Sequence, residues 1–144
     1  MSDKKEQKET PNGVVTEETT AYGDIKINHN VVASIVRLAA LEVDGVDAVA
    51  GGSFVDNVRE IFKPDHAIDV SENEAGQYVI EVRLIMRFGV ELAKVAMQVQ
   101  EGIREQVKTM TMKDVGQVDV IIDGVRSNTG EVTSVSDYQT DTIN

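Results

Sequence analysis

The sequence contains no cysteine and no tryptophan, and phenylalanine and tyrosine are scarce. Without cysteine there can be no disulfide, no thiolate nucleophile and no cysteine-ligated metal, a composition that fits a reducing compartment. Aromatic residues make up 4% of the chain and hydrophobic residues 41%, so a core has to be mainly aliphatic. A chain of 144 residues is suited to one domain that is large enough to bury such a core.

Positive charge and long apolar runs are also lacking. The formal net charge is -11, and nucleic-acid binding depends chiefly on clustered lysine and arginine. The same acidity disfavours adsorption to an anionic bilayer. No stretch approaches the roughly 20 apolar residues of a membrane span, and the first residues do not resemble a secretory signal. We therefore expect a cytoplasmic protein that binds no nucleic acid and does not itself insert into a membrane.

The sequence shows no pattern that is typical of a catalytic or metal site. His29 precedes an expected helix, where a structural or solvent-exposed polar residue is common. His66 adjoins Asp65, but neighbouring residues of an extended chain point to opposite faces and make a poor pair of ligands. An enzyme would need a site assembled from residues such as Asp65, His66 and Glu72, which their spacing does not favour. We expect no catalytic residue, no cofactor and no metal.

The strongest pattern is a strand, a long helix and a second strand over residues 79–125. In residues 91–110 apolar side chains recur at steps of three and four, which predicts a helix with one buried face. The flanking strands alternate between apolar and polar side chains. We expect the helix to lie on their apolar faces, and the strands to pair in parallel if they share a sheet. The expected core positions are Leu92, Val95, Ala96, Val99, Ile103, Val107 and Met110 on the helix, and Tyr78, Ile80, Val82, Leu84, Met86, Phe88, Val118, Val120 and Ile122 on the strands.

The polar faces of the two strands are expected to pair with each other. Asp119 and Asp123 share one face of the second strand, and Arg83 and Arg87 share one face of the first. Cross-strand pairing between these carboxylates and guanidinium groups is the expected outcome, rather than a binding site.

Smaller elements surround this unit. Asn28 is expected to cap a first helix that ends at Gly45, with a short strand at 46–50 and a strand at 66–71 that forms a hairpin with the one starting at Tyr78. The first helix is expected to bury Val31, Val32, Ile35, Val36, Ala39 and Val43. The predicted fold is α/β (α+β), a small two-layer sandwich with helices on one face of a mixed sheet of about four strands, in the order α-β-(short α)-β-β-α-β.

Both ends of the chain are polar. Residues 1–22 predict a disordered N-terminal arm, and residues 127–144 predict a disordered, acidic tail rich in serine and threonine. In that tail, Val132, Val135 and Tyr138 are too sparse to predict a strand. A single domain is therefore expected over residues 23–126.

Residues 53–63 predict a short amphipathic helix that ends at Pro64. Two interpretations are open: its apolar side plugs one end of the core, or it docks a partner helix or a membrane-embedded protein. The residues of this candidate docking stripe are Phe54, Val55, Val58, Ile61 and Phe62.

Four features together resemble the alkaline shock protein family of envelope stress response proteins of Gram-positive bacteria. They are the helix exit AALEVDGV, the Phe88-Gly89 pair before the long helix, the helix segment VAMQVQEGIREQV and the final V-x-V-x-I-x-G-V strand. The resemblance runs from about Gly23 to Arg126. Relatives often start the long helix with Ser-x-Pro, whereas Glu91 and Ala93 stand here, so the first turn lacks that cap.

The resemblance implies a non-enzymatic protein that acts through protein contacts. Some members are held at the cell membrane by a small integral membrane partner and support envelope homeostasis, whereas others look linked to fatty-acid synthesis through acetyl-CoA carboxylase. We expect an interaction or scaffold protein of the envelope stress response, recruited to the inner face of the membrane by such a partner. The alternative is a regulatory module that acts on acetyl-CoA carboxylase. A homo-oligomer that pairs through a sheet edge near Val118–Val125 is also expected.

Overall fold

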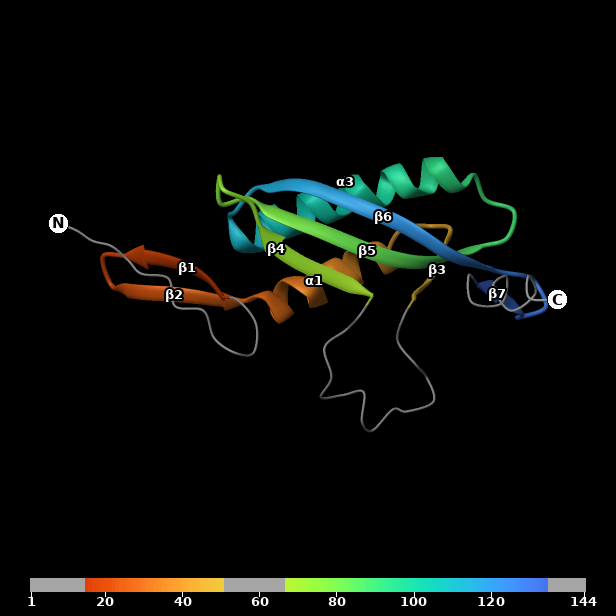
Figure 1. The fold of residues 1–144 in the computed structure, drawn as a ribbon, viewed down its shortest axis with the longest axis horizontal. Helices are drawn as coiled ribbons and strands as arrows, with labels where there is room; N and C mark the ends of the chain where they lie inside the picture. The colour runs from red at the N-terminus through yellow and green to blue at the C-terminus, as the bar shows by residue number, and fades with distance from the viewer. Residues whose placement is uncertain (1–14, 51–66, 135–144) are drawn as a thin grey trace, which may run out of the picture.

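The computed structural model describes residues 15–50 and 67–134, which form two helices, a mixed five-stranded sheet and a separate hairpin (Figure 1). Both helices pack on one face of the sheet, so the predicted two-layer α/β fold is confirmed. In chain order the elements are β1 (Val15–Thr20), β2 (Gly23–Asn28), α1 (His29–Leu41), β3 (Val46–Val49), β4 (Ile68–Glu72), β5 (Tyr78–Arg87), α3 (Leu92–Thr111), β6 (Val115–Arg126) and β7 (Val132–Ser134).

Strand β5 lies at the centre of the sheet. On one side it pairs in parallel with β6, with Ile80 opposite Val118 and Leu84 opposite Ile122, which confirms the predicted parallel pairing. On the other side it pairs antiparallel with β4 and then with β3. The alternation in its sequence turns every second side chain toward the helices. These side chains are fully buried: Tyr78, Ile80, Val82, Leu84 and Met86.

Helix α3 packs on this face through a narrow stripe. Its buried side chains recur every four residues: Val95, Val99, Ile103 and Val107. Leu92 and Met110, which the periodicity places in the stripe, are 39% and 60% exposed. Both lie in a terminal turn, where neighbouring elements cover fewer sides of a helix. Phe88 is also exposed, because β5 ends at Arg87.

Helix α1 begins as predicted, since the side chain of Asn28 accepts a hydrogen bond of 2.8 Å from the backbone N–H of Asn30. Val32 is fully buried and Val31 is half exposed, because neighbouring residues on a helix point about 100° apart and only one can face the core. The helix ends at Leu41, so the expectation that Gly45 caps it is wrong.

Gly45 has a different role, in the turn between α1 and β3. Its φ is +107°, and a Cβ atom there would lie 2.9 Å from a methyl carbon of Val95 on α3. The absence of a side chain therefore permits both the turn and the close approach of the long helix.

The structure differs from the sequence prediction at both ends of the folded region. Val15–Thr20 form β1, which pairs antiparallel with β2, and this hairpin projects from one end of α1 (Figure 1). Val132–Ser134 form β7, which pairs with the last residues of β6. Neither β1 nor β7 shows an apolar alternation, so each depends on the ladder with its neighbour. The expected helix at 53–63 lies outside the described residues.

Candidate protein-interaction surface

Strand β6 has an open side. It pairs with β5 along its whole length, whereas β7 covers its other side only at Gly124–Arg126. From Val115 to Asp123, no strand of the described part of the chain pairs with that side. A strand edge of this kind presents backbone donors and acceptors that can pair with another segment.

Alternate residues of β6 turn their backbone toward the open side. The even-numbered residues of β5 bond to β6, since the N–H of Phe88 donates to a β6 carbonyl at 2.9 Å. Ile80 lies opposite Val118, and in a parallel pair its hydrogen bonds go to the two residues that flank Val118. Val118, and by alternation Val120 and Ile122, therefore direct their N–H and C=O groups away from β5.

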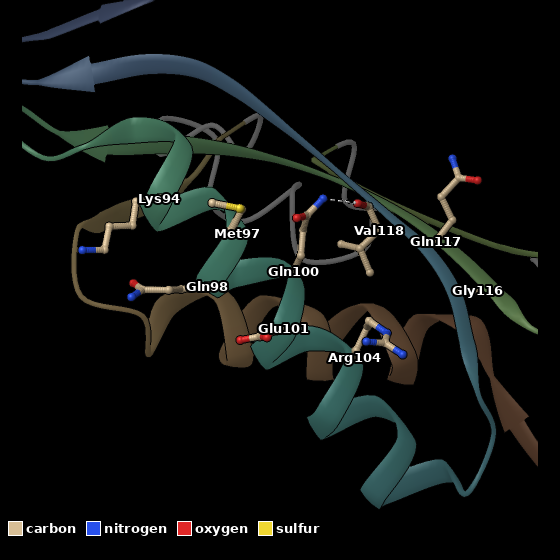
Figure 2. A pocket seen from close by; sticks show the side chains of 9 residues that line it. All are labelled: Lys94, Met97, Gln98, Gln100, Glu101, Arg104, Gly116, Gln117 and Val118. Atoms are coloured by element: carbon tan, nitrogen blue, oxygen red, sulfur yellow. Dashed lines mark hydrogen bonds between the residues drawn. The ribbon is translucent and has the colours of Figure 1, made fainter.

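A groove of about 440 Å³ runs between this open side and α3 (Figure 2). Gln100 projects across it from the helix, and its Nε2 donates a hydrogen bond of 3.0 Å to the carbonyl of Val118. Met97, which also lines the groove, is 59% exposed. Gln117 points away from the helix, as the alternation of β6 requires. The complete lining is Lys94, Met97, Gln98, Gln100, Glu101, Arg104, Gly116, Gln117 and Val118.

The helix side of the groove carries two cations and one anion. Lys94 lies 3.6 Å from Glu91, and both side chains are mostly exposed. Arg104 and Glu101 form no ion pair with any residue in 15–50 or 67–134. In Figure 2, Arg104 lies near the end of β6 that contains Gly116, and Lys94 lies toward its carboxyl end. Among the described residues that line the groove, Arg104 is thus a cation without an ion pair, whereas Lys94 is paired with Glu91.

The opposite face of the sheet is covered by ion pairs. Arg83 lies 3.3 Å from Asp123, which confirms that predicted cross-strand pair. Arg87 instead pairs with Asp44 at 3.1 Å, and Asp119 accepts hydrogen bonds from Gln117. A further pair joins Arg126 and Asp47. Asp44, Asp47 and Asp123 are thus each paired with an arginine, whereas Asp119 is hydrogen-bonded to a neutral amide.

A polar cluster joins four elements at one end of the core. His29 at the start of α1 is 7% exposed, and its Nε2 lies 2.9 Å from an Oε of Glu72 at the end of β4. The other Oε of Glu72 lies 3.3 Å from Lys113, just after α3. The rings of His29 and Tyr78 meet edge to face at 5.9 Å, and the Lys113 ammonium lies 5.6 Å from the Tyr78 ring centre. These contacts hold the start of α1 against the end of β4, the start of β5 and the residue after α3. His29 is therefore a buried structural residue.

Sequence reasoning missed this cluster and the groove. The residues of the cluster come from segments about 40 positions apart, and nothing in their local patterns marks them as neighbours. No group of three or more His, Asp or Glu side chains that could hold a metal occurs in the described ranges. Asp65 and His66, the other members of the conceivable enzyme site, lie outside those ranges.

The expected docking stripe of Phe54, Val55, Val58, Ile61 and Phe62 also lies outside the described residues. Neither α1 nor α3, the helices of the described ranges, has the length and hydropathy that crossing a membrane requires.

Comparison with known proteins identifies relatives. Residues 17–127 match the alkaline shock protein 23 family, which is described as having a cell envelope-related function. The chain is 36% identical over 114 residues to the uncharacterized protein YqhY of Bacillus subtilis strain 168, across 78% of this chain and 84% of that protein. It is 26% identical over 110 residues to the uncharacterized protein YloU of the same strain, across 74% and 92% of the two chains. Solved structures of the MamM CTD share 12% identity at a TM-score of 0.43, over 68% of this chain and 98% of that one, a likeness too weak to carry an argument.

Proposed function

This chain belongs to the alkaline shock protein 23 family, which has a cell envelope-related function, and we propose that it acts there as a non-enzymatic interaction protein. In this proposal the protein serves the envelope stress response in the cytoplasm, and a partner with a membrane-spanning segment recruits it to the inner face of the membrane. The observation that carries the proposal is the open side of β6 next to the groove under α3.

An open strand edge is suited to binding an extended peptide. In strand addition the main-chain hydrogen bonds supply affinity, and pockets for alternate side chains supply specificity. Val118, Val120 and Ile122 present the backbone groups, and the groove beside them offers Met97 as an apolar contact. An extended cytoplasmic segment of the partner would thus add a strand to the sheet.

The polar side chains of the described residues support an interaction role over catalysis. Glu72 is held between His29 and Lys113, and Asp123 is held by Arg83. A general acid or base needs a carboxylate or imidazole that can reach a substrate and change its protonation state. The groove itself contains neither a histidine nor a pair of carboxylates.

The proposal is tested with a substitution that blocks the edge and leaves the fold intact. Val120→Pro removes an N–H that points to the open side, so the ladder with β5 is retained and proline is tolerated there. Val120→Ala is the matched control, because it loses the side chain but keeps the N–H. Circular dichroism establishes that both variants are folded.

Tagged wild-type and variant chains are crosslinked in cells and the captured proteins are identified by mass spectrometry. Each candidate is then purified and titrated against the purified chain. We expect an integral membrane protein that binds the wild type and the alanine variant, and binds the proline variant at least about tenfold more weakly. Equal binding to all three would refute the edge as the site. Capture of acetyl-CoA carboxylase without any membrane protein would refute recruitment and favour the regulatory alternative.

A further inference from the structure

The open side of β6 can pair with the same side of a second copy of the chain. An antiparallel pair of identical strands is related by a two-fold axis perpendicular to the sheet, so each copy gives and receives the same contacts. Val118 and Val120 direct their N–H and C=O groups to the open side, so they supply the hydrogen bonds of such a pair. The axis also keeps both α3 helices on one face of the joined sheet.

We propose that two copies of this chain join through β6, with Val118 opposite Val118 of the second copy, and that this contact occupies the edge when no partner is bound. The two sheets then form one continuous sheet. Self-association does not depend on the proposed function, whereas its competition with a partner does.

The three registers at the middle of the uncovered stretch differ in what they bring together. Centring the pair on Asp119 places the two Asp119 carboxylates directly opposite each other, and like charges in that position destabilise a sheet. Centring it on Val120 places Gly116 of the second copy opposite Gly124, where β7 already pairs. Centring it on Val118 meets neither obstacle, and it sets Val120 opposite Gly116, which has no side chain.

On the face away from the helices, this register brings complementary side chains together. Gln117 lies directly opposite Asp119 of the second copy, and the two-fold axis repeats the contact. Within one chain the Gln117 amide already donates to the two Asp119 carboxylate oxygens at 3.0 and 3.2 Å, so both groups are oriented on the same face. A carboxylate has about four acceptor sites, so it can accept the second amide as well.

On the helix side, the axis passes close to Gln100, because the Nε2 of Gln100 lies 3.0 Å from the Val118 carbonyl. Arg104 lies four residues further on, about 6 Å along the helix. The two Arg104 residues are thus separated by about 12 Å along the helix direction, whereas Glu101 of the second copy is about 7.5 Å away from each. Arg104 and Glu101 form no ion pair within the described ranges, so each can pair with its counterpart across the axis.

Met97 lies on the other side of the axis (Figure 2). It is 59% exposed, and about 1.5 Å along the helix direction separates it from Arg104 of the second copy. The aliphatic part of that arginine would therefore cover the methionine side chain. Lys94, the other cation of the groove, is already paired with Glu91 and takes no part in the proposed contact.

Analytical ultracentrifugation of the purified chain tests the dimer. We expect the wild type and Val120→Ala to dimerise as concentration rises, and Val120→Pro to dimerise at least about tenfold more weakly, because it lacks an N–H that faces the second copy. A wild type that stays monomeric up to about 1 mM would overturn the proposal. Equal self-association of all three chains would place the contact elsewhere and also overturn it.

A charge swap tests the contact between the helices. Arg104→Glu and Glu101→Arg should each raise the dissociation constant of the dimer about fivefold, because every dimer then contains two like-charged contacts. Both substitutions in one chain restore opposite charges across the axis, so the dissociation constant should return to within about twofold of the wild type. A combined variant that dimerises no better than the single variants would overturn the proposed contact.

Disulfide crosslinking tests the register, since the sequence contains no cysteine of its own. Residues opposed in a non-hydrogen-bonded antiparallel pair have Cα atoms about 4.5 Å apart, which permits a disulfide. Oxidation of a mixture of Gln117→Cys and Asp119→Cys chains should therefore give crosslinked dimers at least about fivefold faster than oxidation of either chain alone. Equally fast crosslinking of Asp119→Cys chains with each other would overturn the register, and so would a mixture that does not crosslink.

The failure of this inference is distinguishable from that of the proposed function. Self-association is measured on the purified chain alone, so a monomeric chain refutes the dimer and leaves partner binding to its own assay. If Val120→Pro weakens the dimer but leaves partner binding unchanged, the dimer contact stands and the edge is refuted as the partner's site.

Discussion

Replacing Gly45 by alanine is predicted to destabilise the protein through two separable effects. The φ of +107° lies in a region that side chains rarely adopt, which costs about 1–3 kcal/mol. The added Cβ would also lie 2.9 Å and 3.2 Å from the two methyl carbons of Val95. Because Val95 is buried on α3, it cannot move away without displacing the helix, and such overpacking costs about 1–3 kcal/mol more. The expected loss in free energy of unfolding is therefore about 2–6 kcal/mol.

A control glycine and a second substitution separate the two effects. Gly89 has a φ of +99°, and a Cβ added there would meet no atom within 4 Å, so Gly89→Ala should show only the backbone cost of about 1–3 kcal/mol. Val95→Ala removes the clashing methyl groups and alone costs about 1–3 kcal/mol. In the double variant the steric part of the Gly45→Ala cost should vanish, so the combined loss should be smaller than the sum of the separate losses by about 1–3 kcal/mol. Urea denaturation followed by circular dichroism measures all four variants. If Gly45→Ala costs no more than Gly89→Ala, or if the double variant is additive, the close approach of α3 is not what requires this glycine.

Two further substitutions test the polar cluster and the end of α3. Glu72→Gln should lower the free energy of unfolding by about 1–3 kcal/mol, because it weakens the contacts with His29 and Lys113. The control, Glu74→Gln at an exposed position, should change the free energy of unfolding by less than about 0.5 kcal/mol. Urea denaturation at neutral pH compares the two variants, and equal effects would show that the cluster does not stabilise the fold. Met112 ends α3 with a φ of +62° and is 87% exposed, so Met112→Gly should raise the free energy of unfolding by about 0.5–1 kcal/mol. Met110→Gly, inside the helix, should lower it by a similar amount in the same urea denaturation. If Met112→Gly is destabilising, the methionine side chain contributes more to stability than its backbone conformation costs.

The unit of β5, α3 and β6 could be predicted from the sequence because each element carries its own period. The alternation from Tyr78 to Met86 and the four-residue steps from Val95 to Val107 are properties of one continuous segment. Burial then follows from which side of the element is apolar. Within such segments the errors are confined to the ends, as at Leu92, Met110 and Phe88, where the pattern continues but the neighbouring elements do not.

Elements that depend on a partner strand could not be found in this way. β7 consists of Val132, Thr133 and Ser134, which have no apolar alternation, and its position follows from the turn at Gly130 and the ladder with β6. The pairing of His29 with Glu72 likewise joins residues 43 positions apart. The groove is a further case, because its lining combines the outer side of α3 with the edge of β6 and so depends on how the helix lies across the sheet.

The open side of β6 has two features that limit unspecific pairing with other strands and one that favours a strand carrying carboxylates. The extra residue Asp123 interrupts the regular ladder between Ile122 and Gly124, and irregularities of this kind limit edge-to-edge pairing. The carbonyl of Val118 already accepts a hydrogen bond from the side chain of Gln100, so an incoming strand would share this acceptor or replace Gln100 as its donor. A segment that brings carboxylates to Lys94 and Arg104 gains contacts that an uncharged strand lacks, which turns an edge that could pair indiscriminately into one that selects by charge. The same reasoning requires that Lys94→Glu with Arg104→Glu weaken the binding of a partner segment that carries carboxylates, and an unchanged affinity in a titration of that variant would show that charge does not select the occupant.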